Sequence, residues 1–181
     1  TFRSMLRYGV LYADPHPGNY RFLPDGRVAF LDFGCVKVLS PEMVEGMKRY
    51  MRAAMDADWK EFDRACVEVL GYDPHDESWD LYRSYTMELM VPICTNGIWQ
   101  CSPEKARETV AYLSRGIKSL AFKEGEAIPS IPHVPKMPQE FTFVNRLQWG
   151  LASVLAGLRT EANFREIIDP LVREGVRPYP E

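Results

Sequence analysis

Three polar residues near the start of the chain have the types and spacing that phosphoryl transfer requires. Asp14 and Asn19 lie five positions apart in a loop that contains two prolines, and Asp32 follows eighteen positions after Asp14. Transfer of a phosphoryl group needs a carboxylate that orients the attacking hydroxyl and accepts its proton. It also needs oxygen ligands that hold magnesium against the β- and γ-phosphates. A layout of loop, hairpin and loop can supply both.

The segment between these residues is predicted to be a β-hairpin. Two strand-like runs, 20–23 and 27–31, are joined by Pro24-Asp25-Gly26. Proline presets one turn dihedral and glycine supplies a positive φ, which makes this joint a hairpin signal. Because a hairpin returns the chain to its start, Asp32 is expected to face the loop that carries Asp14 and Asn19.

The chain beyond Leu39 has helical periodicity throughout. Ser40 and Asp58 are predicted helix caps, and Gly71 is a predicted helix end. The expected helices span 41–54, 59–71, 77–90, 103–121, 141–158 and 161–173, with a proline-rich irregular connection over 122–138. The sequence therefore predicts a mainly α-helical fold with one small hairpin.

The bulk composition indicates one soluble globular domain. The 181 residues are 46% hydrophobic and 26% charged, and the net charge of −3 gives no reason to expect nucleic acid as a partner. The densest basic group, Lys48, Arg49 and Arg52, is predicted to be one solvated helix face. Four cysteines without a CxxC pair fit reduced thiols in a cytosol-like compartment better than a zinc site or a disulfide framework.

Two motifs together resemble those of a known family. Asp-x-x-x-x-Asn followed by Asp-Phe-Gly is the catalytic-loop and metal-loop pair of protein kinases. The fuller strings, Ala13-Asp14-Pro15-His16-Pro17-Gly18-Asn19 and Leu31-Asp32-Phe33-Gly34, resemble the UbiB (AarF) family of atypical kinases. The resemblance is dense over 5–40 and looser over 41–175, where 145–147 and 155–159 are similar to the closing helices of that family.

This resemblance implies a fold and a set of roles. The whole chain, 1–181, would be the C-terminal lobe of a kinase-like domain, with the active loops in 10–40 and a helical subdomain in 41–175. Asp14 matches the catalytic aspartate, and Asn19 and Asp32 match the metal ligands. ATP and Mg²⁺ are the cofactors that the resemblance implies.

Three further positions in the motifs carry narrower expectations. Phe33 and Gly34 match the residues that seat the metal-binding loop and are grouped with the cofactor-binding residues. His16, also assigned to cofactor binding, stands where typical protein kinases place a phosphate-contacting lysine. Its alternative role is a hydrogen bond to the local backbone.

The departures from the family pattern are also informative. Tyr12 replaces the histidine that usually precedes Ala-Asp-Pro, and it is expected to support the loop through its hydroxyl and its larger ring. No Gly- or Ala-rich phosphate loop, no strand lysine with a helix glutamate and no Lys-x-Gly-Gln extension precedes Asp14. The chain is therefore expected to be a piece of a longer protein, to lack its N-lobe partner and to be inactive alone.

Several functions stay open at this point. The resemblance implies an atypical kinase or ATPase that supports ubiquinone or related prenyl-lipid biosynthesis, with proteins of that biosynthesis as partners. A pseudokinase scaffold or nucleotide or lipid sensor is one alternative. A phosphotransferase of the aminoglycoside-kinase type is another, although it usually lacks the Phe-Gly that follows Asp32 here. The expected location is cytoplasmic with peripheral membrane contact, or organellar in a eukaryote, and the apolar face of 141–158 could pack in the core or bind a lipid.

Overall fold

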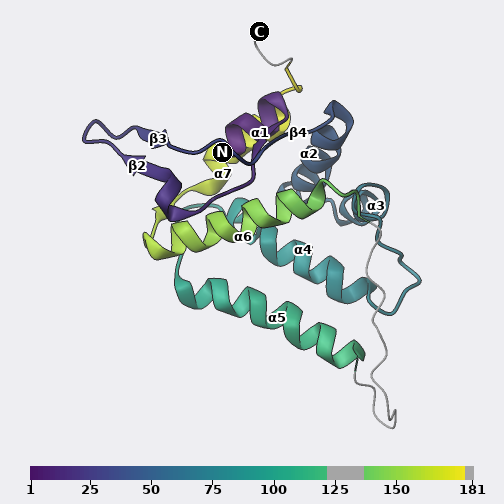
Figure 1. Cartoon of the computed structure of the whole chain (residues 1–181). Coiled ribbons are helices and arrows are strands. Elements are labelled where there is room, and N and C mark those ends of the chain that lie inside the picture. The colour runs from purple at the N-terminus through teal and green to yellow at the C-terminus, as the bar shows by residue number, and fades with distance from the viewer. Residues whose placement is uncertain (122–136, 178–181) are drawn as a thin grey trace.

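The computed structural model describes residues 1–121 and 137–177 (Figure 1). The helices are α1 (Phe2–Tyr8), α2 (Pro41–Met55), α3 (Trp59–Leu70), α4 (Trp79–Cys94), α5 (Pro103–Ala121), α6 (Phe141–Gly157) and α7 (Phe164–Arg173). The strands are β1 (Val10–Tyr12), β2 (Tyr20–Phe22), β3 (Val28–Phe30), β4 (Val36–Val38), β5 (Trp99–Gln100) and β6 (Glu161–Ala162), and a 3₁₀ turn, η1, covers Pro17–Asn19. The predicted mainly helical fold is confirmed.

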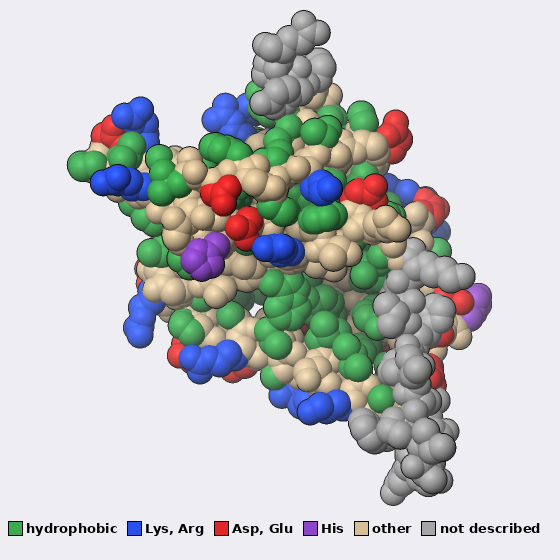
Figure 2. Space-filling model, viewed as in Figure 1, with side chains coloured by type: hydrophobic (Ala, Val, Ile, Leu, Met, Phe, Trp, Pro, Cys, Tyr) green, Lys and Arg blue, Asp and Glu red, His purple; other side chains and the backbone are tan. Residues whose placement is uncertain are grey.

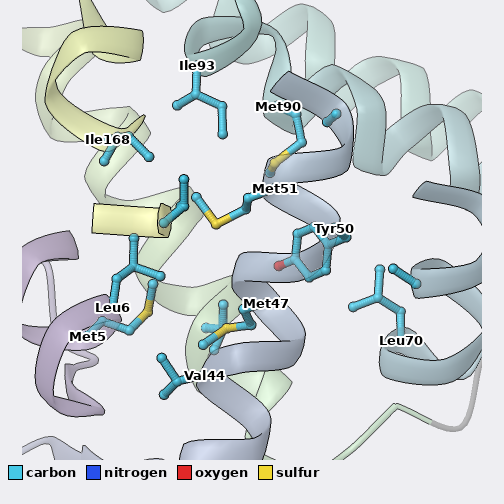
Figure 3. Packing of buried hydrophobic residues seen from close by; sticks show 14 of the residues in the cluster. Met5, Leu6, Val44, Met47, Tyr50, Met51, Leu70, Met90, Ile93 and Ile168 are labelled. Carbon is cyan, nitrogen blue, oxygen red and sulfur yellow. The ribbon is translucent and has the colours of Figure 1, made fainter. Parts of the chain in front are cut away.

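Helix α2 is the centre of the hydrophobic core. It contacts α1, α3, α4 and α7, and Val44, Met47, Tyr50 and Met51 on it are all buried. Each side chain of this size contributes about 1.5–3 kcal/mol when it is fully removed from water. Figure 3 shows these residues among side chains from the neighbouring helices: Met5, Leu6, Leu70, Met90, Ile93 and Ile168.

The predicted helix caps are present, and the bounds of α4 and α7 differ most from the prediction. Ser40 Oγ accepts a hydrogen bond from the Met43 amide, and Gly71 ends α3 with a φ of 69°. Helix α4 continues through Pro92 to Cys94, beyond the predicted end. Helix α7 begins at Phe164 rather than at 161, because Asn163 is its cap and the preceding residues pair with β5 as strand β6.

The predicted hairpin is also present. Strands β2 and β3 pair antiparallel, and the turn between them closes with Gly26 at a φ of 81°. Figure 1 shows this hairpin projecting from the helical body. A second antiparallel pair, β1 with β4, was not predicted, because it joins two three-residue strands across the whole hairpin.

Lys48 corrects the prediction of a solvated basic face on α2. Its side chain is 0% exposed, and its Nζ donates a hydrogen bond to the carbonyl oxygen of Glu174 at 2.7 Å. Arg52 Nη1 donates to the Val172 carbonyl at 2.7 Å, while Arg49 pairs with glutamates of α3. The last carbonyls of a helix have no partner within the helix. Lys48 and Arg52 therefore satisfy carbonyls at the end of α7. Burial lowers the pKa of Lys48.

The remaining predictions about the chain concern its membrane contact and its proline-rich connection. In the part of the chain that the structure describes, no helix is both long and apolar enough to cross a membrane. The predicted irregular connection over 122–138 lies almost entirely outside the described residues.

Candidate functional site

Two loops meet at the root of the hairpin: the Asp14 loop (residues 13–19) and the Asp32 loop (residues 31–35). The Ala13 amide donates a hydrogen bond to the Cys35 carbonyl at 2.9 Å. At the other end of the Asp14 loop, the Asn19 carbonyl accepts a hydrogen bond from the Leu31 amide at 3.0 Å. Together with the β1–β4 and β2–β3 pairs, these bonds hold the two loops side by side, as the hairpin predicted.

The Asp14 carboxylate has two partners, one within its own loop and one from a distant helix. Asn19 Nδ2 donates to Asp14 Oδ2 at 2.9 Å, and Arg146 Nη2 donates to Asp14 Oδ1 at 2.9 Å. The Asp14 side chain is 30% exposed, so it stays accessible from solvent. Because Asn19 directs its amide nitrogen at Asp14, its amide oxygen is the atom with which it could ligate a cation.

Asp32 is exposed at the start of a tight turn. Its Oδ1 accepts a hydrogen bond from the Gly34 amide at 2.7 Å. A Cβ atom at position 34 would lie 3.1 Å from this same oxygen, so glycine allows the close approach. Phe33 is 66% exposed, and its ring meets the Tyr12 ring edge-on at a centroid distance of 6.4 Å.

His16 makes the local backbone contact that was its alternative role. The Gly18 amide donates to His16 Nδ1 at 3.1 Å, and His16 is the N-cap of η1. This contact engages one of the two ring nitrogens in the local backbone. A cofactor-binding role for His16 stays a prediction.

Tyr12 supports the two loops through its ring. The ring is 5% exposed and meets Tyr20 and Phe30 edge-on, at centroid distances of 6.3 and 5.3 Å. Its hydroxyl is buried and, among the described residues, has no hydrogen-bond partner. Burial raises the pKa of Tyr12, the nearby Asn19 side chain lowers it in part, and the negative charges of Asp14 and Asp32 raise it. The ring therefore supports the loops as expected, whereas support through the hydroxyl stays a prediction.

Helix α6 packs against the Asp14 loop and strand β4 through three residues on one face. Phe143 lies below the Lys37 ammonium at 4.8 Å, Arg146 pairs with Asp14, and Gly150 abuts Pro15. A Cβ atom at Gly150 would lie only 2.2 Å from Pro15 Cγ, so the helix and the loop are in close contact. Figure 2 shows acidic, histidine and basic side chains gathered on the face between the hairpin and α6.

Comparison with known proteins finds relatives among the atypical kinases. Residues 1–66 match the ABC1 atypical kinase-like domain. A chloroplastic aarF domain-containing protein kinase of Arabidopsis thaliana is 26% identical over 158 residues, which are 81% of this chain and 23% of the relative. The chloroplastic protein ACTIVITY OF BC1 COMPLEX KINASE 1 of the same plant is 26% identical over 172 residues, 95% of this chain and 23% of the relative. The match over residues 1–66 and these two relatives support a place in the ABC1 atypical kinase-like family.

A solved structure extends the comparison to nearly the whole chain. The complex of Rv3197 with erythromycin from Mycobacterium tuberculosis superposes with a TM-score of 0.69 at 16% identity. The superposition covers 98% of this chain and 42% of that one. The fold is therefore kinase-like along the described chain, as predicted. The chain also spans 23% of the length of the two plant relatives.

The predicted magnesium ligands are of the kind that suits a metal sharing its coordination with a nucleotide. Among the described residues, no group of three or more His, Cys, Asp and Glu side chains could hold a metal ion by itself. Magnesium in nucleotide sites is commonly held by one or two carboxylates together with phosphate oxygens and water. The Asp32 carboxylate and the Asn19 amide oxygen suit such a shared site.

Arg146 is the site residue that sequence reasoning did not find. It lies outside the 1–66 segment that matches the ABC1 family model. The spacing of 143, 146 and 150 places these residues on one helix face, but nothing local predicts that this face covers the Asp14 loop. The neighbouring apolar residue Leu147 is 0% exposed, so it packs in the core rather than on a lipid-facing surface.

Proposed function

We propose that this chain forms the catalytic part of an atypical kinase or ATPase that uses Mg²⁺ and ATP. The observation that carries the proposal is the clamping of the Asp14 and Asp32 loops by two backbone hydrogen bonds, Ala13–Cys35 and Leu31–Asn19. These bonds keep the candidate base Asp14 and the candidate metal ligands Asn19 and Asp32 at one end of the hairpin. A nucleoside triphosphate could reach all three there.

Each residue has a separate role in this proposal. Asp14 orients the attacking hydroxyl or water and accepts its proton. Asn19 holds Asp14 in place with its amide nitrogen and would ligate Mg²⁺ with its amide oxygen, and Asp32 would be the second protein ligand. When bound, Mg²⁺ would neutralise charge on the phosphates. The Gly34 amide donates a hydrogen bond to Asp32 Oδ1 and so fixes the orientation of this carboxylate.

An exposed apolar surface beside the site suggests where the rest of the protein binds. Phe22, Leu31 and Phe33 are each at least 60% exposed, and Val38 is 78% exposed. Large exposed apolar surfaces mark interaction sites, and the plant relatives are much longer than this chain. We propose that the nucleotide-gripping N-lobe of the same protein covers this surface, and that the isolated chain binds ATP weakly.

A non-catalytic nucleotide sensor or scaffold is the second candidate. It is favoured by the ion pair of Asp14 with Arg146, because the proposed base is already engaged by a cation. A sensor would use the same Asn19 and Asp32 contacts to bind nucleotide without turnover. An aminoglycoside-kinase type of phosphotransferase is less well supported, since Phe33 and Gly34 follow Asp32.

The cellular role proposed here follows from the family resemblance. We propose a function in ubiquinone or related prenyl-lipid biosynthesis, with proteins of that biosynthesis as partners and with peripheral contact to a membrane. The chloroplastic names of the plant relatives support an organellar location if the source is eukaryotic. A cytoplasmic, membrane-associated location is proposed for a bacterial source.

Phosphate release from Mg²⁺-ATP by the full-length protein tests the proposal, with and without lipid vesicles. Asp32→Asn should abolish turnover and weaken nucleotide binding. Asp73→Asn is the matched control, because Asp73 is also exposed and also accepts a backbone amide two residues on, from His75 at 2.8 Å. If Asp32→Asn loses turnover and Asp73→Asn keeps it, the result supports the proposal of an enzyme. Binding without turnover under every condition supports the sensor, and equal Mg²⁺-ATP affinity in both variants would refute the site assignment.

A further inference from the structure

The two active loops contain no positively charged residue that could contact a phosphate. Residues 13–19 and 31–35 include neither lysine nor arginine. His16 occupies the position of the phosphate-contacting lysine in typical kinases, but its Nδ1 already accepts a hydrogen bond from the Gly18 amide. Transfer of a phosphoryl group requires positive charge near the oxygens of the transferring phosphate. In this chain such a charge has to come from another element.

Arg146 brings a guanidinium to this place from α6. Its Nη2 lies 2.9 Å from Asp14 Oδ1, although the two residues are 132 positions apart. The Arg146 side chain is 59% exposed, so most of the group is open to solvent and accessible to a ligand. A guanidinium has five N–H donors in a rigid planar fork. One bond to Asp14 leaves most of this fork available.

The helix that carries Arg146 has contacts on both sides of this residue, one with the Asp14 loop and one with strand β4. Four positions on, Gly150 lies so close to Pro15 that a Cβ atom would overlap the ring at 2.2 Å. Three positions earlier, the Phe143 ring packs below Lys37 of β4. The backbone at 146 is thereby fixed relative to Asp14, and only the side chain of Arg146 has to move to reach a nearby phosphate.

We propose that Arg146 is a catalytic residue that binds the γ-phosphate of the nucleotide and supplies the positive charge missing from position 16. This inference rests on the proposed function. Without nucleotide, the guanidinium pairs with Asp14. A γ-phosphate attracts it more strongly, because phosphate oxygens accept two parallel hydrogen bonds from the fork and carry more charge.

When the Arg146 guanidinium moves to the phosphate, the Asp14 carboxylate is free to act as the base. Asp14 then accepts the proton of the attacking hydroxyl or water while that oxygen bonds to the γ-phosphorus. The bond from the γ-phosphorus to the bridging oxygen of ADP breaks, and its electron pair leaves with ADP. Since ADP has no γ-phosphate, the Arg146 contact should favour ATP over ADP.

The test uses the full-length protein and three substitutions. Arg146→Met removes the charge, Arg146→Lys keeps the charge without the fork, and Arg64→Met is the matched control. Arg64 on α3 is 53% exposed and makes a single ion pair, with Glu61 at 3.0 Å, far from the loops. Calorimetry gives the affinities for Mg²⁺-ATP and Mg²⁺-ADP, and phosphate release gives the turnover.

Arg146→Met should lower the ratio of ATP to ADP affinity by about tenfold or more, the usual effect of losing a charged hydrogen bond. The ADP affinity of Arg146→Met should stay unchanged, and its turnover should fall by at least the same factor as the affinity ratio. The affinity ratio and the turnover of Arg146→Lys should lie between those of Arg146→Met and wild type. Arg64→Met should match wild type. If the Met variant is unstable, Arg146→Gln removes the charge while it keeps a donor for Asp14, and it provides the same ratio.

Two results would overturn the inference. The first is that Arg146→Met changes the ATP and ADP affinities equally, or changes neither, although wild type binds nucleotide and Asp32→Asn weakens that binding. Arg146 then does not contact the γ-phosphate, and the proposed function stands without this inference. If the wild-type protein binds no nucleotide, the proposed function fails and this inference fails with it.

Discussion

The ammonium of Lys48, fully buried on α2, lies 2.7 Å from the carbonyl oxygen of Glu174 just beyond the end of α7. Methionine at this position would remove the desolvation of the charge but would leave the carbonyl without its donor. An unsatisfied buried acceptor costs about 1–3 kcal/mol, and a hydrogen bond to a charged group is worth a similar amount. Lys48→Met should therefore lower the free energy of unfolding by about 1–3 kcal/mol.

Denaturant unfolding of Lys48→Met and Lys60→Met measures this effect. Lys60 is an exposed lysine of α3, so its replacement should change the free energy of unfolding by less than about 0.5 kcal/mol. A Lys48→Met protein as stable as wild type would show that the desolvation cost of the ammonium cancels its hydrogen bond.

The contact between Gly150 and Pro15 predicts an effect on both stability and activity. Alanine at 150 places a methyl group 2.2 Å from the Pro15 ring, so α6 or the Asp14 loop has to shift. Overpacking of this kind costs about 1–3 kcal/mol. Because Pro15 directly follows Asp14, Gly150→Ala should also reduce the turnover of the full-length protein.

Gly157→Ala is the control on the same helix. A Cβ atom at Gly157 meets nothing within 4 Å. Alanine there should be neutral or should stabilise the helix by up to about 1 kcal/mol. Equal effects of the two substitutions on stability and turnover would contradict a specific role for the close contact at Pro15.

The local part of the fold and of the candidate site was predictable from sequence. The hairpin was predicted from Pro24-Asp25-Gly26, and its closure brings the Asp32 loop back to the Asp14 loop. Caps such as Ser40 act within one helical turn, so their signal is contained in neighbouring residues. Asp14 and Asp32 were found in the same way, because each motif is a short continuous string.

The features that were missed all depend on residues far apart in the chain. Pairing of β1 with β4, burial of Lys48 under α7 and approach of Arg146 to Asp14 join segments separated by the hairpin or by most of the chain. A periodic pattern shows which face of a helix is apolar, but it does not show which element covers the other face. Tertiary packing decided these three, and the sequence carries no local signal for them.

Removing the unpartnered hydroxyl of Tyr12 should not lower the free energy of unfolding, whereas most core substitutions do lower it. Phenylalanine keeps the edge-on ring contacts with Tyr20 and Phe30 and removes a buried hydroxyl that has no hydrogen-bond partner among the described residues. Removing such a group is neutral or stabilising. Tyr12→Phe should raise the free energy of unfolding by between zero and about 1 kcal/mol.

Tyr72→Phe is the matched comparison for Tyr12→Phe. The buried Tyr72 hydroxyl shares a hydrogen bond of 2.8 Å with Thr86 Oγ1, so its loss should cost about 0.5–1.5 kcal/mol. Chemical denaturation of both variants would separate the two cases. Equal destabilisation by the two substitutions would mean that the Tyr12 hydroxyl has a partner in solution.

The Glu174 carboxylate should make the stability of the protein depend on pH. Arg7 binds its carboxylate through Nε at 3.0 Å and Nη2 at 2.8 Å, and this holds the pKa of Glu174 below its ordinary value. When the folded-state pKa is lowered, the unfolded chain takes up the proton first as the pH falls. The stabilisation is therefore complete above the ordinary glutamate pKa, about 4.3, and is lost as the pH falls through the lower folded-state value.

Thermal unfolding of wild type and Glu174→Gln over about pH 7 to pH 3 measures this dependence. The variant should be less stable than wild type near neutrality, and the two should converge in acid, because protonation removes from wild type the charge that the variant already lacks. The Asp56–Arg173 pair, which also lowers a carboxyl pKa, is present in both proteins and cancels in the difference. A difference that stays constant across the whole range would show that Arg7 does not bind the ionised form of Glu174 preferentially.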